Sequence, residues 1–404
     1  MELIELNSEE LSLGMALKYT LRDETGAVLL AKGNRIETDR QLASIKSRKK
    51  ILVEFDETVA GTRALMSGIS ALTRAGAPIK DISKFVSSQP ALSEDKLVGT
   101  LVERWGDMES KLRGLLGSVD TTPDFDKKIR TLTRHIDTLM MENSSSSIFL
   151  LFNRAVTHFE GYSVTHALLC ATLAHTMSEV FVMTEDERQS LVCAALTMNV
   201  AMTRLQDVLA AQKDVPNVHQ RKEIDDHPLN GMKILMGAGV KDKIWLEIVA
   251  RHHEALKGPD LLADWPPVLR LTKILQTLDR YTAALSPRKS REGRTARDST
   301  RSVVVQPGAN KQDEVGSALF RNLGMCPPGT YVKLNNGETA VVIRRGSKPM
   351  EPVVASVLNR NDEPIAEPRA RDTAIPTHAI QSVLTATAIK VNLRLEAMCR
   401  LIAA

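Results

Sequence analysis

Five side chains in the middle of the sequence are of the types that bind metal ions. Imidazole nitrogens and carboxylate oxygens are common protein ligands of divalent Fe, Mn and Zn. The candidates lie on four stretches that read as helices, and they are His166, His227, His252, His253 and Asp279. Because they are far apart in the sequence, only the fold can bring them together.

The neighbouring residues His252 and His253 limit how such ligands can be shared. On a helix, neighbouring side chains point about 100° apart, so we expect that these two rings cannot easily bind one ion. They can serve two ions, or one ion and one substrate group. His166 and Asp279, with His252, would give a mononuclear site, and His227 with His253 a second one. Alternatively, the histidines are surface residues, or core residues that bond to carbonyl groups or to Asp279.

The sequence around these candidate ligands predicts a mainly α-helical fold. Apolar residues recur at helical spacing almost throughout residues 147–285. Thr184, with Glu187 three residues later, matches the capping box that begins a helix. Long amphipathic patterns over residues 60–145 indicate a helical connector, and the polar ENSSSS at 142–147 predicts a break after it.

Both ends of the sequence predict β-structure. Residues 9–55 read as strands and turns around one short helical stretch, RQLASIKS. Near the other end, TYVKLNNGETAVVIRR places an Asn-Gly turn between two alternating strands, which is a strong hairpin signal. We therefore expect a β-rich N-terminal domain over 1–60, a helical connector over 61–145, a helical domain over 146–325, and a β-hairpin extension with a terminal helix over 326–404.

Composition excludes several classes of partner. Lys and Arg number 53 against 49 Asp and Glu, and this net charge of +4 is too small to indicate nucleic-acid binding or a membrane surface. The four cysteines have no CxxC spacing and mostly apolar surroundings, which predicts reduced thiols and a cytoplasmic protein. No signal-peptide pattern is present, and no run approaches the roughly 18 apolar residues of a membrane span.

The order of the candidate ligands resembles the HD-GYP branch of the HD phosphohydrolases, a bacterial signalling family. That family has a His, an HDxGK motif, a His-Pro, an HHE stretch leading to GYP, and a DxxDA segment followed by SxRxYR. The corresponding elements here, over roughly residues 147–360, are His166, LTMNVAM, His227-Pro228, His252-His253-Glu254 and Asp279. The resemblance implies an HD-type helical core, a divalent metal (Fe, Mn or Zn) and cyclic di-GMP phosphodiesterase chemistry.

The sequence departs from this family at both signature motifs. At the HDxGK position Met198, Asn199 and Met202 replace the motif's His, Asp and Lys. The family's Asp bridges two metal ions, whereas an amide has no charge and a thioether suits such ions poorly. Since phosphodiester hydrolysis at such a site needs both ions, we expect no ordinary catalysis. The simpler interpretation of the two methionines is that they fill core volume from one face of a helix.

The second signature, GYP, is also missing. After HHE the chain reads ALKGPDLLADWPPV, which argues against a conventional cyclic di-GMP pocket. The segment 286–301 holds six Arg or Lys against Glu292 and Asp298, a local charge of 6 − 2 = +4. In it Arg288 and Arg291 match the two arginines of SxRxYR. Their planar guanidinium groups suit phosphate, and the alternative is a solvated basic loop.

Three functions follow, in this order of preference. The first is a non-catalytic signalling regulator that acts through protein contacts, because the scaffold pattern persists while both motifs are lost. The second is a sensor that binds cyclic di-GMP or a related nucleotide through Arg288 and Arg291 without cleaving it. The third is an active metal-dependent phosphohydrolase with an altered site. The amphipathic stretch 60–145 also suggests a homodimer.

Overall fold

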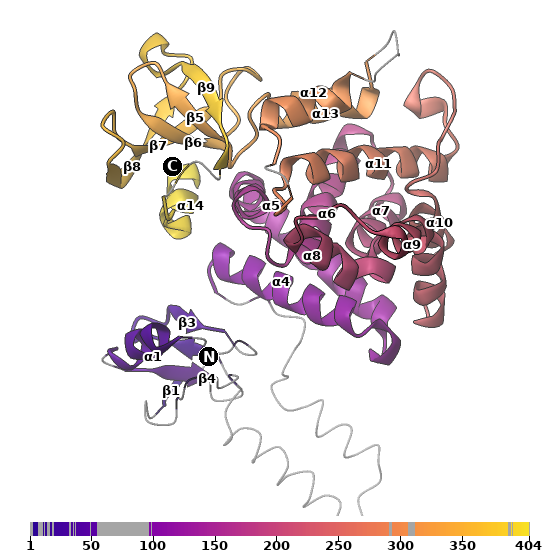
Figure 1. Ribbon diagram of the computed structural model, residues 1–404, viewed down its shortest axis with the longest axis horizontal. Coiled ribbons are helices and arrows are strands. Elements are labelled where there is room, and N and C mark those ends of the chain that lie inside the picture. The colour runs from indigo at the N-terminus through magenta and orange to yellow at the C-terminus, as the bar shows by residue number, and fades with distance from the viewer. Residues whose placement is uncertain are drawn as a thin grey trace, which may run out of the picture. The chain divides into compact units, whose positions relative to one another are not determined.

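The computed structural model describes residues 3–6, 11, 13, 17, 20–31, 34, 36, 38–48, 50–54, 97, 99–290, 293–305, 312–386, 389 and 391–403. The chain divides into two compact units, Met1–Asp107 and Met108–Ala404, and each is described by itself. Most of the described residues are helical, and the strands form two antiparallel sheets (Figure 1). The prediction of a mainly α fold is confirmed. Residues 61–96 of the predicted connector lie outside the described residues.

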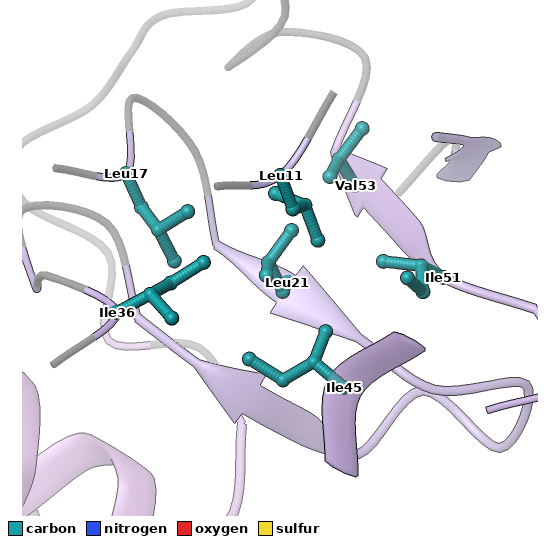
Figure 2. Packing of buried hydrophobic residues seen from close by; sticks show 7 residues of the cluster. All are labelled: Leu11, Leu17, Leu21, Ile36, Ile45, Ile51 and Val53. Carbon is teal, nitrogen blue, oxygen red and sulfur yellow. The ribbon is translucent and has the colours of Figure 1, made fainter. Parts of the chain in front are cut away.

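The N-terminal unit is a small sheet with one short helix. Its strands are β1 (Leu3–Glu5), β2 (Leu21–Arg22), β3 (Val28–Leu30) and β4 (Leu52–Glu54), in the order β1-β4-β2-β3. The predicted short helix is α1 (Asp39–Lys46), and it begins where the Thr38 side chain accepts a hydrogen bond from the Gln41 amide. Figure 2 shows the core of this unit, in which aliphatic side chains from strands, loops and α1 converge: Leu11, Leu17, Leu21, Ile36, Ile45, Ile51 and Val53.

The larger unit is built around one buried helix, α6 (Tyr162–Val180). Nearly all residues of α6 are buried, on every face of the helix, which is typical of a helix enclosed by others. It packs against α5 (Phe125–Thr157), α7 (Glu185–Thr197) and α11 (Pro267–Leu285) (Figure 1). The other helices are α4 (Leu101–Gly117), whose first residues belong to the N-terminal unit, α8 (Thr203–Ala211), α9 (Val218–Gly237), α10 (Lys243–Arg251), α12 (Ala296–Val304) and α13 (Glu314–Leu323).

Local sequence signals act at the start of α7 and in the middle of α5. Thr184 and Glu187 form a capping box at the start of α7, as their spacing predicts. The expected break at 142–147 is a kink, not the end of a helix. Asn143 has non-helical backbone angles (φ −160°, ψ 84°), yet α5 continues beyond it. Its side-chain oxygen accepts a hydrogen bond from the Ser146 amide at 2.9 Å, so it caps the second segment of α5.

The C-terminal part of the larger unit is a five-stranded antiparallel sheet in the order β8-β7-β6-β5-β9. Its strands are β5 (Tyr331–Leu334), β6 (Thr339–Arg344), β7 (Val353–Leu358), β8 (Pro364–Asp372) and β9 (Ile380–Leu384). The predicted hairpin is β5–β6, with Gly337 at φ +83° in its turn. The expected extension was too small, because three further strands complete the sheet. The terminal helix α14 (Leu395–Ala403) packs against α5 and the sheet.

No helix among the described residues is long and apolar enough to cross a membrane.

Candidate metal centre

His166 and Asp279 meet where α6 packs against α11. Nε2 of His166 lies 2.8 Å from Oδ1 of Asp279, and Sγ of Cys170 lies 3.7 Å from the same nitrogen. One ligand atom from each of these residues lies within 4.8 Å of the others, so a metal ion can reach all three. The apolar surroundings of Cys170 predict an ordinary buried thiol. Cys170 follows His166 by four residues, so both side chains lie on one face of α6. This spacing is the sequence signal that could have identified Cys170 as a candidate ligand.

The pair of His166 and Asp279 is electrostatically matched. Burial acts to lower the pKa of His166, but the charges of Cys170 and Tyr162 and the bond to the nearby carboxylate raise it well above its usual value. Burial acts to raise the pKa of Asp279, but the hydrogen bond and charge of His166 hold it well below its usual range. Both directions describe a buried imidazolium and carboxylate that stabilise each other. A metal ion can take the place of the shared proton.

Tyr162 connects this pair to Arg288, one of the two arginines predicted to bind an anion. Its ring stacks on the imidazole of His166, with 5.5 Å between centroids and 13° between planes. The guanidinium of Arg288 lies 5.0 Å from the centre of the tyrosine ring, and its Nη2 donates to the Tyr162 hydroxyl at 3.0 Å. Arg288 therefore braces Tyr162 through a hydrogen bond and a cation–π contact. Arg291, the second of these arginines, lies outside the described residues.

His227, His252 and His253 form a second group where α9 packs against α10. The ring centroid of His227 lies 5.0 Å from that of His252 and 5.1 Å from that of His253. One ligand atom from each ring lies within 4.8 Å of the others. The expectation that His252 and His253 cannot easily bind one ion assumed that both lie on a helix, and the structure does not place them so. Helix α10 ends at Arg251, His252 caps it, and His253 lies beyond it.

This grouping also differs from the one predicted. His252 was expected to join His166 and Asp279, and His227 was expected to pair with His253 alone. The structure instead places all three neighbouring imidazoles together and leaves His166 and Asp279 with Cys170. The difference arises from the turn after α10, since its backbone direction is not readable from ligand spacing.

Hydrogen bonds fix the tautomers of the two buried rings in this group. Nδ1 of His252 lies 2.7 Å from the carbonyl oxygen of Val249, and Nδ1 of His227 is hydrogen-bonded to the carbonyl of Ile224. A carbonyl only accepts, so each Nδ1 carries a proton. The two Nε2 atoms then point lone pairs at each other across 3.1 Å. Two ligand nitrogens around one zinc ion at about 2.05 Å stand about 3.3 Å apart, so this spacing suits a shared ion.

Burial keeps both rings neutral, as metal ligands must be. Burial lowers the pKa of His227 to about 4, with the Ile224 carbonyl and Asp279 acting against it. Burial, reinforced by the charges of His253 and His227, lowers the pKa of His252 to about 3. Neither ring takes up a second proton at neutral pH, so no proton lies between the facing Nε2 lone pairs. A backbone carbonyl on the far nitrogen is the usual support of a metal-binding histidine, and the residues present therefore fit a metal ion.

Gln276 on α11 holds the turn that carries His252 and His253. Its side-chain Nε2 donates to the carbonyl oxygen of Glu254 at 2.8 Å and to that of Arg251 at 3.3 Å. These bonds satisfy carbonyl groups that the end of α10 leaves without helical partners. Sequence reasoning gave no reason to single out Gln276, because its role depends on how α11 packs against α10.

The segment 198–202 lies beside α9. Helix α7 ends at Thr197, and the 3₁₀ turn η4 (Val200–Met202) packs against α9. Met198 is buried and Met202 half-buried. Both methionines pack into the interior, as expected. They do not share one helix face, because α7 ends at Thr197, before either of them. Asn199 carries a buried Oδ1 that has no hydrogen-bond partner among the described residues.

Close packing fixes the position of this segment. A Cβ atom added at Gly231 of α9 would lie 3.4 Å from side-chain atoms of Val200 and Val249, and 3.7 Å from the carbonyl oxygen of Met198. Gly231 lies one helical turn after His227 on α9. The neutral segment and the three-histidine group thus belong to the same packed region, and the segment contributes no charged oxygen to it.

The described residues thus offer two neighbouring groups of candidate ligands, and residues 198–202 contribute no carboxylate between them. The charge of Asp279 acts on the pKa of both His227 and His252, so the two groups lie within electrostatic reach of each other. Comparisons with protein-family models, with curated proteins and with solved structures find no match to this chain.

Proposed function

We propose that this chain is a non-catalytic signalling regulator of the HD-GYP type, which holds one divalent metal ion and acts through contacts with other proteins. The metal, of the class Fe, Mn or Zn, binds at His227, His252 and His253. All-imidazole sites suit these ions. The regulator is cytoplasmic, and the segment 61–145, for which the sequence predicts a helical connector, pairs two copies of the chain.

The observation that carries the proposal is the neutral side chain of Asn199. A dinuclear phosphodiesterase needs a charged oxygen shared by its two ions, and it uses the pair to activate water and to clamp the attacking and leaving oxygens. An amide at this position, between Met198 and a tightly packed turn, cannot act as a ligand that bridges the two groups. The three histidines alone provide three neutral donors for one ion.

The test combines metal analysis with an activity assay. Purified protein loaded with Mn²⁺, Fe²⁺ or Zn²⁺ is expected to retain about one ion per chain, and His252→Ala is expected to lose it. Neither protein is expected to cleave cyclic di-GMP or bis(p-nitrophenyl) phosphate. Turnover that disappears in His252→Ala or Asp279→Ala would establish the mononuclear phosphohydrolase instead.

Restoring the motif gives a second, positive test. The double variant Met198→His with Asn199→Asp returns an imidazole and a bridging carboxylate to the segment. We expect its metal content to rise from about one ion to about two per chain, because the carboxylate screens two neighbouring cations. Unchanged metal content in a folded double variant would contradict the assignment of this segment to the metal centre.

A nucleotide sensor is the second candidate, and titration calorimetry with cyclic di-GMP separates it from the regulator. The contact of Arg288 with Tyr162 favours a bracing role for this arginine. We therefore expect no heat of binding at high micromolar cyclic di-GMP. Binding that Arg288→Ala abolishes would favour the sensor.

A further inference from the structure

The larger unit contains a cavity of about 350 Å³, bounded by the kink of α5, the last turns of α6, the end of α13 and the end of β6. This volume falls in the range of small-molecule sites, about 300–1,000 Å³. None of the metal-centre residues lines it. On α6, His175 reaches the cavity nine residues after His166, which is about 13 Å along the helix axis.

Two arginines without partners stand at this cavity. Arg344 and Arg345 both line it and are exposed, and their guanidinium groups have no ion pair or hydrogen bond with any residue that the structure describes. Consecutive strand residues normally point to opposite faces. Here the pairing of β6 with β7 shifts register between Val342 and Arg344, and β6 ends at Arg344, so both guanidinium groups reach one cavity. Arg371 of the same sheet, by contrast, pairs with Glu338.

His175 supplies a buried polar group at the wall. The residue is 8% exposed, and its Nε2 lies 3.1 Å from Oδ1 of Asp137. A carboxylate accepts, so this nitrogen carries the proton. The other ring nitrogen, Nδ1, is buried and has no hydrogen-bond partner among the described residues. A buried imidazole nitrogen without a hydrogen-bond partner destabilises the folded protein unless a ligand or a water molecule bonds to it.

The start of the second segment of α5 adds donors. Ser144 and Ser145 follow the kink at Asn143, line the cavity, and have hydroxyl groups with no hydrogen-bond partner in the described part of the chain. They lie at the positive end of a helical segment, where anions are stabilised. The carboxylate of Glu179 also lines the cavity, so two arginines and one glutamate give a formal charge of +1.

Apolar side chains cover the rest of the wall, among them Met140, Ile148, Leu323 and Pro328. A ligand that fits must therefore combine an anionic group with an apolar body. Two guanidinium groups beside two hydroxyls suit a phosphate, which carries about two negative charges and several acceptor oxygens.

We propose that this cavity binds a small organic phosphate, with the phosphate between Arg344 and Arg345 and the apolar part against Met140, Ile148 and Leu323. The site is separate from the metal centre and does not rest on the proposed regulator function.

Isothermal titration with phenyl phosphate tests the proposal on the full-length protein. We expect saturable binding that is unaffected by EDTA and weakens as NaCl is raised. The double variant Arg344→Ala with Arg345→Ala is expected to weaken binding at least tenfold, by loss of charge-assisted hydrogen bonds. Glu179→Gln is expected to tighten it several-fold, because a repelling carboxylate is removed. Inorganic phosphate and benzoate, as probes of the anion and of a carboxylate head, are expected to bind more weakly.

The matched control is Arg360→Ala with Arg369→Ala, which removes the same charge from exposed positions in the β7–β8 turn and in β8 that do not line the cavity. Circular dichroism establishes that each variant is folded. Absence of phenyl phosphate binding, or equal loss in the cavity variant and this control, would overturn the proposal. Tighter binding of benzoate than of phenyl phosphate would overturn the assignment of phosphate.

Discussion

The facing Nε2 atoms of His227 and His252 couple metal binding to stability at the scale of single residues. Their lone pairs repel each other across 3.1 Å unless a cation lies between them. A ligand that binds only the folded chain stabilises it, by about 2.7 kcal/mol when its concentration is 100 times the Kd. The metal-free protein should therefore be measurably less stable than the metal-loaded one.

Thermal unfolding with and without EDTA measures this difference. We expect EDTA to lower the melting temperature by about 5–10 °C, and we expect His227→Ala to abolish the response. His219→Ala removes an exposed imidazole from the same helix and serves as the control. An equal EDTA response in the wild-type and His227→Ala proteins would contradict the three-histidine site.

Gln276 is a positioning residue, and its replacement should weaken metal binding without touching a ligand. Gln276→Leu keeps the approximate size but removes the donor to the carbonyls of Arg251 and Glu254. Loss of a group that orients metal ligands typically costs about 10–100-fold in affinity. Competition with a chelating dye measures the affinity. Gln189→Leu, at a half-buried position of α7, is the matched control and should leave it unchanged.

At the scale of elements, the kink of α5 depends on one cap. Replacing Asn143 by Ala removes the oxygen that accepts from the Ser146 amide, and we expect the free energy of unfolding to fall by about 1 kcal/mol. Urea denaturation measures this change. Asn361→Ala, in an exposed turn of the C-terminal sheet, should change it much less. A larger loss at Asn361 than at Asn143 would mean that the cap contributes little.

The C-terminal sheet carries a pH-dependent contribution from Glu338. Burial acts to raise the pKa of this carboxylate, but bonds from Arg371, Ser356 and Asn336 lower it to about 2. Because the folded pKa is below the usual 4.5, the stabilisation is fully present above pH 4.5 and is lost as pH falls toward 2.

Glu338→Gln should therefore destabilise the protein near neutral pH and hardly at all near pH 2. We expect a loss of about 1–2 kcal/mol at pH 7, seen by denaturation at a series of pH values. Glu367→Gln, on the exposed edge strand β8, is the control. A loss from Glu338→Gln that does not change with pH would show that the charge is not what stabilises the sheet.

Which elements could be predicted depends on how local their cause is. The capping box of Thr184 and Glu187 and the Asn-Gly turn of the β5–β6 hairpin are set by residues a few positions apart, and both were predicted. Strand β8 was missed because it is an edge strand with charged, mostly exposed side chains and no apolar alternation. A sheet is completed by pairing across long distances, which local patterns do not record.

The site followed the same rule. All five candidate residues were singled out by side-chain type, and each of them lies in one of the two groups that the structure forms. Which candidate belongs to which group was not predicted, because this depends on where α10 ends. Cys170 could have been found from its spacing to His166. Gln276 could not, since its contact with the turn after α10 arises from helix packing alone.

At the scale of the whole molecule, the two compact units predict independent folding. A fragment of residues 97–404 keeps α4 complete and contains the whole larger unit. We expect it to show the helical circular dichroism and EDTA response of the full chain. Loss of either would mean that the larger unit depends on the N-terminal one.

Sedimentation of the same two proteins tests the proposed dimer. If residues 61–145 pair two chains, the full-length protein should sediment as a dimer and the fragment should dissociate more readily. Monomers in both cases at micromolar concentration would contradict this part of the proposal.

The end of α10 at Arg251 also determines which changes the chain can tolerate. The three imidazoles converge because a turn, and not another helical residue, follows Arg251. Insertion of one residue between Arg251 and His253 would rotate at least one ring away while preserving every ligand. A similar insertion in the loop 255–261, after the turn that Gln276 holds, would leave the rings in place. Variants of this protein must therefore conserve the number of residues between Arg251 and His253 as well as the histidines themselves.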